Sequence, residues 1–366
     1  MQIAIVGLAS SGKTTVFNTL TRGHAETGGF GGLTVNVGVV KVPDERLARL
    51  TALFHPKREV PADVTYIDLP APPSATEGGG ANDLPAEALA RLRNADALLH
   101  VVRAFEDPAV SHPDGSVDAG RDIERFELEF VLADLVVAEK RLEKLRTSGR
   151  HGTAAEREAN EREAVVLDRI VPALRAGQPI RDLGLDEDDA KIVRGYRFLT
   201  EKPELVLLNV GEGDLGGAEA AVAKVTAAIQ HRQTLVDALS ARIEMEIGEL
   251  DDESAAVFRE ELGLTESSLD RVIRLSYRLL GLISFFTAGP DETRAWTIHE
   301  GDDAVAAAAA IHTDLARGFI RAEVVLCEDL LAAGSMAEAR RHGKLRSEGK
   351  TYRVRDGDVI EVLFNV

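Results

Sequence analysis

The sequence predicts an α/β fold, in which a parallel sheet carries an inserted antiparallel helical hairpin and is followed by a smaller C-terminal α+β module. Three observations support this fold class. Short apolar runs alternate with helical patterns over residues 1–107 and again over 203–238, as in strand–helix–strand units. A long helical seam separates these two parts. From residue 285 onward the predicted elements become short and mixed.

The first twenty residues carry the most specific pattern in the chain. Gln2 to Val6 is an apolar run typical of a buried parallel strand, and residues 7–14 match G-x-x-x-x-G-K-[ST] at every position. A helix is predicted from Thr14 to Leu20, so successive backbone N–H groups would face a phosphate at its N-terminus. The alternative is an ordinary Gly/Ser turn with a solvated lysine. Because strand, loop and helix follow in the required order, the pattern predicts a P-loop NTPase.

This motif also assigns roles to single residues. Lys13 would bridge the β- and γ-phosphates as a catalytic residue, and the Thr14 hydroxyl would bind Mg²⁺. Asp68 ends a predicted strand at 64–69, where a carboxylate would reach the same Mg²⁺. The alternative is an aspartate that starts a turn before Pro70. The residues expected to hold the phosphates are Gly7, Ser10, Ser11, Gly12, Lys13, Thr14 and Thr15.

The remaining elements of the nucleotide-binding part follow from periodicity. Strands are predicted at 34–42, 95–102, 203–210 and 234–238, and helices at 43–54, 84–93 and 218–231. Two stretches rich in glycine or proline, 23–33 and 70–84, are predicted loops. His100 falls inside a predicted buried strand, which indicates a packed core histidine.

The inserted hairpin is predicted from two helical segments, 121–145 and 154–176, with glycines between them. Apolar residues of the first segment recur at alternating spacings of three and four, which makes one narrow seam. They are Leu128, Val131, Leu135, Ala138, Leu142 and Leu145. The dense charge of the hairpin is typical of a solvated face, and a partner surface is the alternative.

The C-terminal module is predicted to hold strands at 294–298, 319–325, 352–355 and 359–364 and a helix at 304–315. Together with the hairpin it suggests four consecutive segments. These are 1–120 and 197–282 for the two parts of the nucleotide-binding domain, 121–196 for the helical insertion, and 283–366 for the C-terminal domain.

Composition limits the class of partner. The formal net charge is −18 and the isoelectric point is near 5.0, which argues against a surface that coats DNA, and no specific DNA binding is expected. Cys327 is the single cysteine, so no intrachain disulfide can form; a buried thiol and a reducing, cytoplasmic setting are expected. No stretch is long and apolar enough for a membrane span, so no membrane partner is expected.

One basic cluster could still contact RNA. It lies before the final strands and consists of Arg340, Arg341, Lys344, Arg346 and Lys350. Because a short basic cluster is weak evidence, ordinary surface charge is an equal alternative.

A nucleotide base should be bound by loops at later strand ends of the same sheet. Asn209, Val210 and Glu212 follow one such strand, and Ser240 and Ala241 follow the next. Proteins of this fold that bind guanine usually carry Asn-Lys-x-Asp there. Here Val210 replaces the lysine and Glu212 is one methylene longer than aspartate, so the guanine contact should be weaker and adenine becomes plausible.

The chain resembles the YchF, or Obg-like, ATPases over essentially its full length. The matching stretches include GLASSGKTTVFNTLT at 7–21, NVGVVKVPDERL at 36–47, HVVRAFED at 100–107, NVGE at 209–212, SARIEMEIGELDDE at 240–253, LDRVIRLSYRLLGLISFFTAGPDETRAWTI at 269–298, and GKTYRVRDGDVIEVLFNV at 349–366. The resemblance implies an ATP-preferring P-loop nucleotidase with a helical insertion and a C-terminal TGS domain of ubiquitin-like fold, acting near the ribosome.

The resemblance also implies roles that this sequence alters. Ser10 stands where family members usually have asparagine, which bears on assistance by K⁺. Gly32 occupies the place of the switch I threonine, and Asp68 is followed by Leu-Pro-Ala-Pro instead of a glycine-containing switch II. The family's catalytic histidine maps to His112, which would orient the attacking water; a solvated loop histidine is the alternative. The redox-linked cysteine of some relatives maps to Gly31.

These observations favour slow Mg²⁺-dependent ATP hydrolysis by a protein that associates with the ribosome. The altered switches suggest a second hypothesis, a hydrolysis-poor adaptor that binds nucleotide and contacts ribosome or RNA through its C-terminal and helical domains. A third hypothesis keeps GTP as the nucleotide, because neither Val210 nor Glu212 forbids it.

Overall fold

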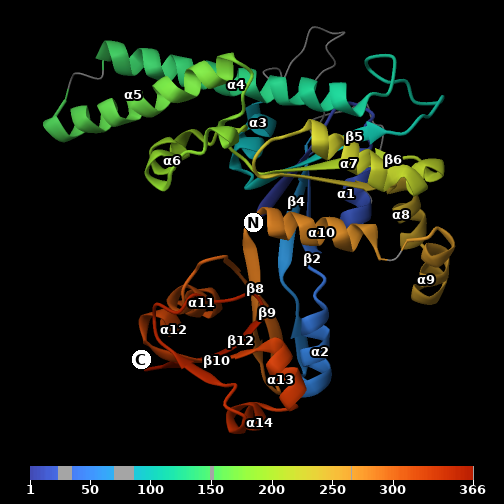
Figure 1. The fold of residues 1–366 in the computed structure, drawn as a ribbon, viewed down its shortest axis with the longest axis vertical. Helices are drawn as coiled ribbons and strands as arrows, with labels where there is room; N and C mark the ends of the chain where they lie inside the picture. The colour runs from blue at the N-terminus through green and yellow to red at the C-terminus, as the bar shows by residue number, and fades with distance from the viewer. Residues whose placement is uncertain (24–34, 70–85, 149–151, 265, 366) are drawn as a thin grey trace. The chain divides into compact units, whose positions relative to one another are not determined.

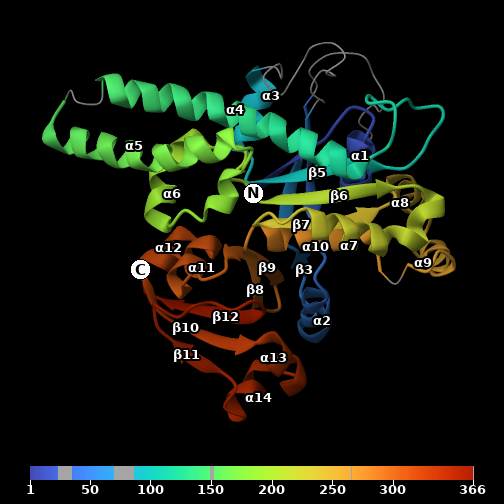
Figure 2. The same ribbon diagram turned by 45° about the horizontal axis from the view of Figure 1, so that its top comes forward.

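The computed structural model describes residues 1–23, 35–69, 86–148, 152–264 and 266–365. The expectations for Gly31, Gly32 and the segments 23–33 and 70–84 therefore lie, apart from residue 23, outside the described residues. The chain divides into two compact units, shown in Figures 1 and 2. The first comprises Met1–Gly38 and Thr65–Val272, and the second comprises Val39–Val64 and Ile273–Val366.

The first unit is built on a six-stranded sheet with the order β2-β4-β1-β5-β6-β7. The strands β4, β1, β5, β6 and β7 run parallel to one another in that order, as the sequence predicts for this part of the chain. Their bounds are β1 Gln2–Val6, β2 Asn36–Lys41, β4 Asp63–Asp68, β5 Ala97–Ala104, β6 Glu204–Val210 and β7 Thr234–Leu239. Every residue of β6 is buried, because helices cover both faces of the sheet.

Helices of the first unit follow the strands in the expected alternation. Their bounds are α1 Lys13–Thr21, α3 Ala86–Asn94, α4 Ala119–Ser148, α5 Ala154–Arg175, α6 Glu187–Val193, α7 Ala218–Ala228, α8 Ala241–Gly248, α9 Asp252–Glu261 and α10 Ser268–Leu279, the last of which continues into the second unit. Short 3₁₀ turns are η3 Ile180–Leu183, η4 Arg194–Tyr196 and η5 Glu212–Gly217. None of the helices in the described part of the chain is both long and apolar enough to cross a bilayer.

The helical hairpin is present, and α4 and α5 lie side by side in both views (Figures 1 and 2). The first half of α4 also covers the sheet, since Phe126 and Phe130 pack among buried strand residues. A capping box, in which Thr153 and Glu156 bond each other's backbone N–H, begins α5. Most of the predicted seam is correct, since Val131, Ala138, Leu142 and Leu145 are buried there. Leu128 is the exception: it is 49% exposed and does not belong to the hairpin core.

The second unit is built on a mixed six-stranded sheet with the order β11-β10-β12-β8-β9-β3. Its strands are β3 Arg58–Val60, β8 Leu282–Ala288, β9 Glu292–His299, β10 Phe319–Leu326, β11 Arg346–Glu348 and β12 Asp358–Phe364. Its helices, besides the last turns of α10, are α2 Glu45–Phe54, α11 Ala304–Ile311, α12 Thr313–Arg317, α13 Cys327–Ala333 and α14 Met336–Arg341. The expected C-terminal α+β fold is therefore confirmed, and Cys327 is buried in it as predicted.

Three sequence predictions for this unit need correction, and one strand of its sheet was missed among others. Residues 39–64 group with the C-terminal residues rather than with the nucleotide-binding part, since β3 pairs with β9. The predicted helix at 304–315 is broken at His312, whose side chain accepts a hydrogen bond from the Asp314 N–H and so starts a second helix. The segment 352–355 forms only an isolated bridge between Asp303 and Arg353. The strand at 282–288 was not anticipated.

Candidate functional site

The loop between β1 and α1 has the backbone that its glycines permit. Gly7 has φ +145° and Gly12 has φ +93°, both disfavoured for residues with a Cβ. A Cβ at Gly7 would collide with the Val101 carbonyl oxygen, and one at Gly12 would collide with the Asn209 amide. The loop therefore lies against β5 and β6, and Gly12 leads into the N-terminus of α1. This is the geometry in which backbone N–H groups bind a phosphate.

Lys13 and Thr14 open the helix and face the carboxylate at the end of β4. The Lys13 side chain is buried, and its ammonium donates to the Leu8 carbonyl at 2.8 Å. Burial lowers the pKa of Lys13 to about 8, against the opposing attraction of Asp68. The Thr14 hydroxyl donates to Asp68 Oδ2 at 3.0 Å, and the Asn36 amide donates to the same oxygen at 3.3 Å.

The donor set fits a divalent cation. Asp68 is 5% exposed, and burial raises its carboxyl pKa above the ordinary range. Its second oxygen, Oδ1, is buried and finds no hydrogen-bond partner among the described residues. A hydroxyl beside a carboxylate with one unpartnered oxygen is the oxygen-rich set that Mg²⁺ prefers.

Asn209 joins the P-loop to the strand end beyond it. Its amide donates to the Ser11 carbonyl at 3.0 Å, and its side-chain oxygen accepts from the Ala241 N–H at 3.0 Å. With 5% of its surface exposed, Asn209 acts here as a brace between two loops. The sequence argument assigned it to the base and had no signal for this contact.

The other residues predicted to contact the nucleotide differ in burial and in the element that carries them. Ser240 and Val210 are buried, at the carboxyl ends of β7 and β6. Glu212 is exposed and begins η5, so it is accessible at the expected position of a base. Ser10 is exposed with φ +61°, and Thr15 is half-buried in the first turn of α1.

His112 lies beside the P-loop, and protein groups engage both of its ring nitrogens. Together with Leu8, Ala9 and Ser11 it lines a small pocket. Its Nε2 is 2.8 Å from Asp122 Oδ2, and its Nδ1 accepts from the Asp114 N–H at 3.1 Å. In this arrangement the imidazole holds a loop to the start of α4 and presents no unoccupied nitrogen to a water.

His112, Asp114 and Asp122 bring three possible metal-ligating atoms within 4.8 Å of one another. Arginines already neutralise both carboxylates, since Arg121 pairs with Asp122 and Arg125 pairs with Asp114. The cluster is therefore an ion-pair network at the start of α4.

Two family models match the chain. One, described as a 50S ribosome-binding GTPase, matches residues 2–140, and the C-terminal model of YchF GTPases, described as a protein of unknown function, matches residues 282–365. The "Ribosome-binding ATPase YchF" of Bacillus subtilis is 41% identical over 99% of this chain and 98% of its own. The chain belongs to the YchF family. The protein of the same name from Escherichia coli O157:H7 is 38% identical, again over 99% of this chain and 98% of its own.

A solved YchF structure has the same fold. It is the Schizosaccharomyces pombe YchF GTPase, which matches with a TM-score of 0.84 and 30% identity over 99% of this chain and 97% of its own. The P-loop NTPase fold with its C-terminal domain is thus the YchF fold.

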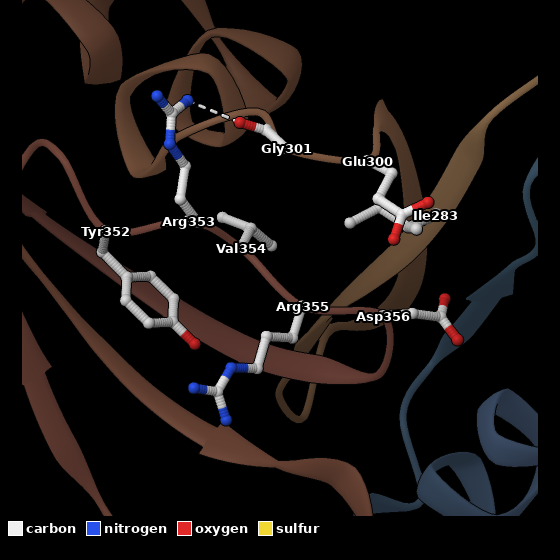
Figure 3. Close-up of a pocket in the computed structure, with 8 residues that line it drawn as sticks. All are labelled: Ile283, Glu300, Gly301, Tyr352, Arg353, Val354, Arg355 and Asp356. Atoms are coloured by element: carbon white, nitrogen blue, oxygen red, sulfur yellow. Dashed lines mark hydrogen bonds between the residues drawn. The ribbon is translucent and has the colours of Figure 1, made fainter.

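The second unit of this YchF-family chain has a pocket of its own. Its volume is about 500 Å³, and Tyr352, Arg353, Arg355 and Glu300 are among the lining residues (Figure 3). Arg353 donates to the carbonyl of Gly301, another lining residue, at 2.5 Å. None of the predicted site residues lines this pocket.

The basic cluster at 340–350 is largely neutralised within the same unit. Ion pairs connect Arg340 with Glu323, Arg341 with Glu338, Lys344 with Asp329, and Arg346 with Glu348 and Asp358. This pairing favours the alternative of ordinary surface charge over a free RNA-binding patch.

Sequence reasoning missed Asn36 and Asp122 as members of the site. Asn36 begins β2 and supports the Asp68 carboxylate, while Asp122 orients His112. Neither belongs to the P-loop motif. A polar residue at the start of an otherwise apolar strand was the available signal for Asn36.

Proposed function

We propose that this chain is an ATP-preferring P-loop nucleotidase that hydrolyses ATP slowly in the presence of Mg²⁺ and associates with the ribosome in the cytoplasm. The supporting observation is the arrangement of Lys13, Thr14 and Asp68 around a loop shaped by two positive-φ glycines. The YchF relatives from bacteria carry the name ribosome-binding ATPase. The exposed Glu212 and the apolar Val210 support adenine over guanine.

The chain's own groups would act mainly by positioning charge. The loop N–H groups and the α1 N-terminus bind the phosphates, and the Lys13 ammonium moves from the Leu8 carbonyl to the β- and γ-phosphate oxygens. Thr14 and Asp68 would hold Mg²⁺, which neutralises charge that develops on those oxygens. Because the Lys13 side chain is buried, water screens its charge less, and its attraction to a phosphate is stronger than that of a lysine at the surface. Ser10 would contribute to a K⁺ site less well than an asparagine.

Asn209 and Ala241 would form one wall of the base site, with Glu212 and Ser240 at its edges. Because Asn209 already uses its oxygen on Ala241, its second amide hydrogen is the group left for a purine. That hydrogen would face N7, which adenine and guanine share. The choice between ATP and GTP would then depend on Glu212.

Ribosome association would involve the second unit and the helical hairpin. In the second unit, Arg355 is exposed at a pocket and makes no ion pair with any described residue, unlike the paired arginines of the 340–350 cluster. A phosphate-rich surface would be attracted to it.

The deciding experiment is single-turnover hydrolysis of γ-labelled ATP and, separately, GTP, with protein in excess and Mg²⁺ and K⁺ present. We expect ATP to be bound and cleaved faster than GTP. Lys13→Ala should abolish cleavage, because no other described cation lies beside Thr14 and Asp68, while Lys41→Ala, an exposed lysine on β2, should leave it unchanged. Cleavage retained by Lys13→Ala would refute the site.

The same assay tests the role of His112. If its loop folds over the γ-phosphate during turnover, His112→Ala lowers the cleavage rate at unchanged nucleotide affinity. If it only holds the loop to α4, His112→Ala and Asp122→Asn both lower thermal stability and leave the rate per folded molecule unchanged.

A hydrolysis-poor adaptor is the second candidate, and the engagement of both His112 nitrogens favours it. In that case ATP remains bound but intact in the single-turnover assay. Co-sedimentation with ribosomes would then be insensitive to nucleotide, whereas an ATPase cycle predicts that ATP changes the sedimented fraction.

A further inference from the structure

The helical hairpin carries an apolar stripe that faces away from its own core. Leu128, Leu132 and Val136 lie at intervals of four residues on α4, so they share one side of the helix. Their exposed fractions are 49%, 44% and 56%. The hairpin core uses other positions of α4, so it forms without these three side chains. An exposed apolar row of this kind indicates an interaction surface.

Opposite charges bound this stripe at its two ends. Glu124 lies one turn before Leu128, and Lys140 lies one turn after Val136. Both are exposed, and neither makes an ion pair within the residues that the structure describes. Along α4 this surface is therefore acidic at Glu124, apolar from Leu128 to Val136, and basic at Lys140.

Such a surface is complementary to itself when a second copy runs antiparallel. A two-fold axis at Leu132 places Leu128 opposite Val136 of the other copy. Between residues 121 and 143, no like-charged pair results from this operation. The charged pairs that it produces are Glu124 with Lys140, Arg125 with Glu139, and Arg121 with Glu143. Of these, Glu124 with Lys140 is the pair in which both members lack an ion-pair partner among the described residues of their own chain.

We propose that the exposed face of α4 is a self-association surface, on which a second copy of this chain packs with its α4 antiparallel about a two-fold axis at Leu132. The contact is isologous and therefore closes at a dimer. Rows of residues spaced by four interdigitate best when the helices cross obliquely, so the apolar contact is confined to the middle turns. The interface is small, below the ~1,200 Å² of stable complexes, so the dimer forms at high protein concentration. This surface is independent of the nucleotide site.

Sedimentation equilibrium of the full-length chain over a micromolar to millimolar series tests the proposal. We expect a reversible monomer–dimer equilibrium that weakens as salt rises. Leu132→Lys places two ammonium groups together on the axis and should raise the dissociation constant at least about tenfold. Val165→Lys is the matched control, because Val165 is 59% exposed on α5 and lies outside the stripe. Circular dichroism and thermal melts confirm that each variant is folded.

Charge reversal tests the antiparallel arrangement itself. Glu124→Lys and Lys140→Glu should each weaken the dimer, since each creates two like-charged contacts. An equimolar mixture of the two variants should recover association, because both contacts of the mixed dimer are again of opposite sign. A native chain that stays monomeric throughout, or a mixture that does not recover, overturns the proposal. Loss of ribosome co-sedimentation in Leu132→Lys, with a monomeric native chain, would assign the stripe to the ribosome instead.

Discussion

Asn209 shows how one buried side chain organises the nucleotide site. It lies where the P-loop, the end of β6 and the start of α8 meet, and each of its two hydrogen bonds crosses between separate elements. A Cβ on Gly12 would occupy the place of the Asn209 amide, so this position of the motif must be glycine for Asn209 to make its hydrogen bonds. Asn209 thus links the phosphate loop to the strand ends at which the base is expected to bind.

A substitution of Asn209 can distinguish its role in connecting the two loops from a role in recognising the base. Asn209→Ala leaves the Ala241 N–H and the Ser11 carbonyl without their partner, which costs about 1–3 kcal/mol for a buried group. Because both bonds are internal, ATP and GTP should lose affinity by the same factor, roughly tenfold or more. Titration with fluorescent analogues of both nucleotides measures this. Glu212→Ala is the comparison, expected to change the ratio of the two affinities; a changed ratio in Asn209→Ala would contradict the bracing role.

At the scale of elements, a charge network ties the helical insertion to the sheet. Arg181 of η3 pairs with Glu204 of β6 at 3.0 Å and with Glu127 of α4. His231, which follows α7, lies between Glu127 at 2.9 Å and Asp182 at 2.6 Å. The network therefore connects η3, β6, α4 and the segment after α7.

This network predicts a pH dependence of stability. The hydrogen bond to Glu127, together with the one to Asp182, raises the pKa of His231 to about 9, although partial burial acts to lower it. Since the folded value lies above the unfolded value of about 6.5, the stabilisation is complete below pH ~6.5 and is lost as pH rises through ~9. The free energy of unfolding should therefore fall by about 2–3 kcal/mol over that range, measured by urea denaturation.

His231→Asn provides the control, because it keeps a hydrogen-bonding side chain but cannot carry the charge. Its free energy of unfolding should be lower at pH 6 and nearly level between pH 7 and 9.5. An equally steep fall in this variant would show that another group titrates.

At the scale of the whole molecule, the chain enters the second unit twice. Between β2 and β4 the chain leaves the first sheet, adds α2 and β3 to the second unit, and returns through β4. Arg46 of α2 joins this segment to the C-terminal residues, since it donates to Asp356 at 2.6 Å, while Asp356 accepts from the Ser284 N–H at 2.9 Å. Its guanidinium also lies 5.3 Å from the centre of the Phe286 ring.

Loss of Arg46 should therefore loosen the second unit selectively. Arg46→Ala removes bonds to two carboxylates and a ring contact, and we expect a loss of about 1–2 kcal/mol. Hydrogen exchange should accelerate at the amides of β8 and β12 and stay unchanged at those of β5 and β6. Arg49→Ala is the matched control, because the Arg49 pair with Glu328 is exposed and should contribute less than ~0.5 kcal/mol. Equal acceleration in both units would mean that they unfold as one.

Local patterns explain why much of this architecture is visible in the sequence. The P-loop is a contiguous motif whose glycines, lysine and threonine act together within one turn, so the sequence predicts Lys13 and Thr14 as neighbours in the site. Asp68 was predicted separately, from its place at the end of a strand. Periodicity placed α2, α5, β5 and β6, because burial on one or both faces leaves a regular apolar pattern. The helical hairpin followed from its seam in the same way.

The tertiary structure decided what depends on residues far apart in the chain. Pairing of β3 with β9 moved residues 39–64 to the second unit, and a three-residue edge strand leaves no periodic signal. The brace from Asn209 to Ser11 spans 198 positions. Leu128 matched the seam by spacing but is exposed, since spacing fixes which residues share a face and not which face is covered. The sequence by itself determined most of the longer elements and the phosphate loop; packing between distant segments determined the short edge strand and the partners of each side chain.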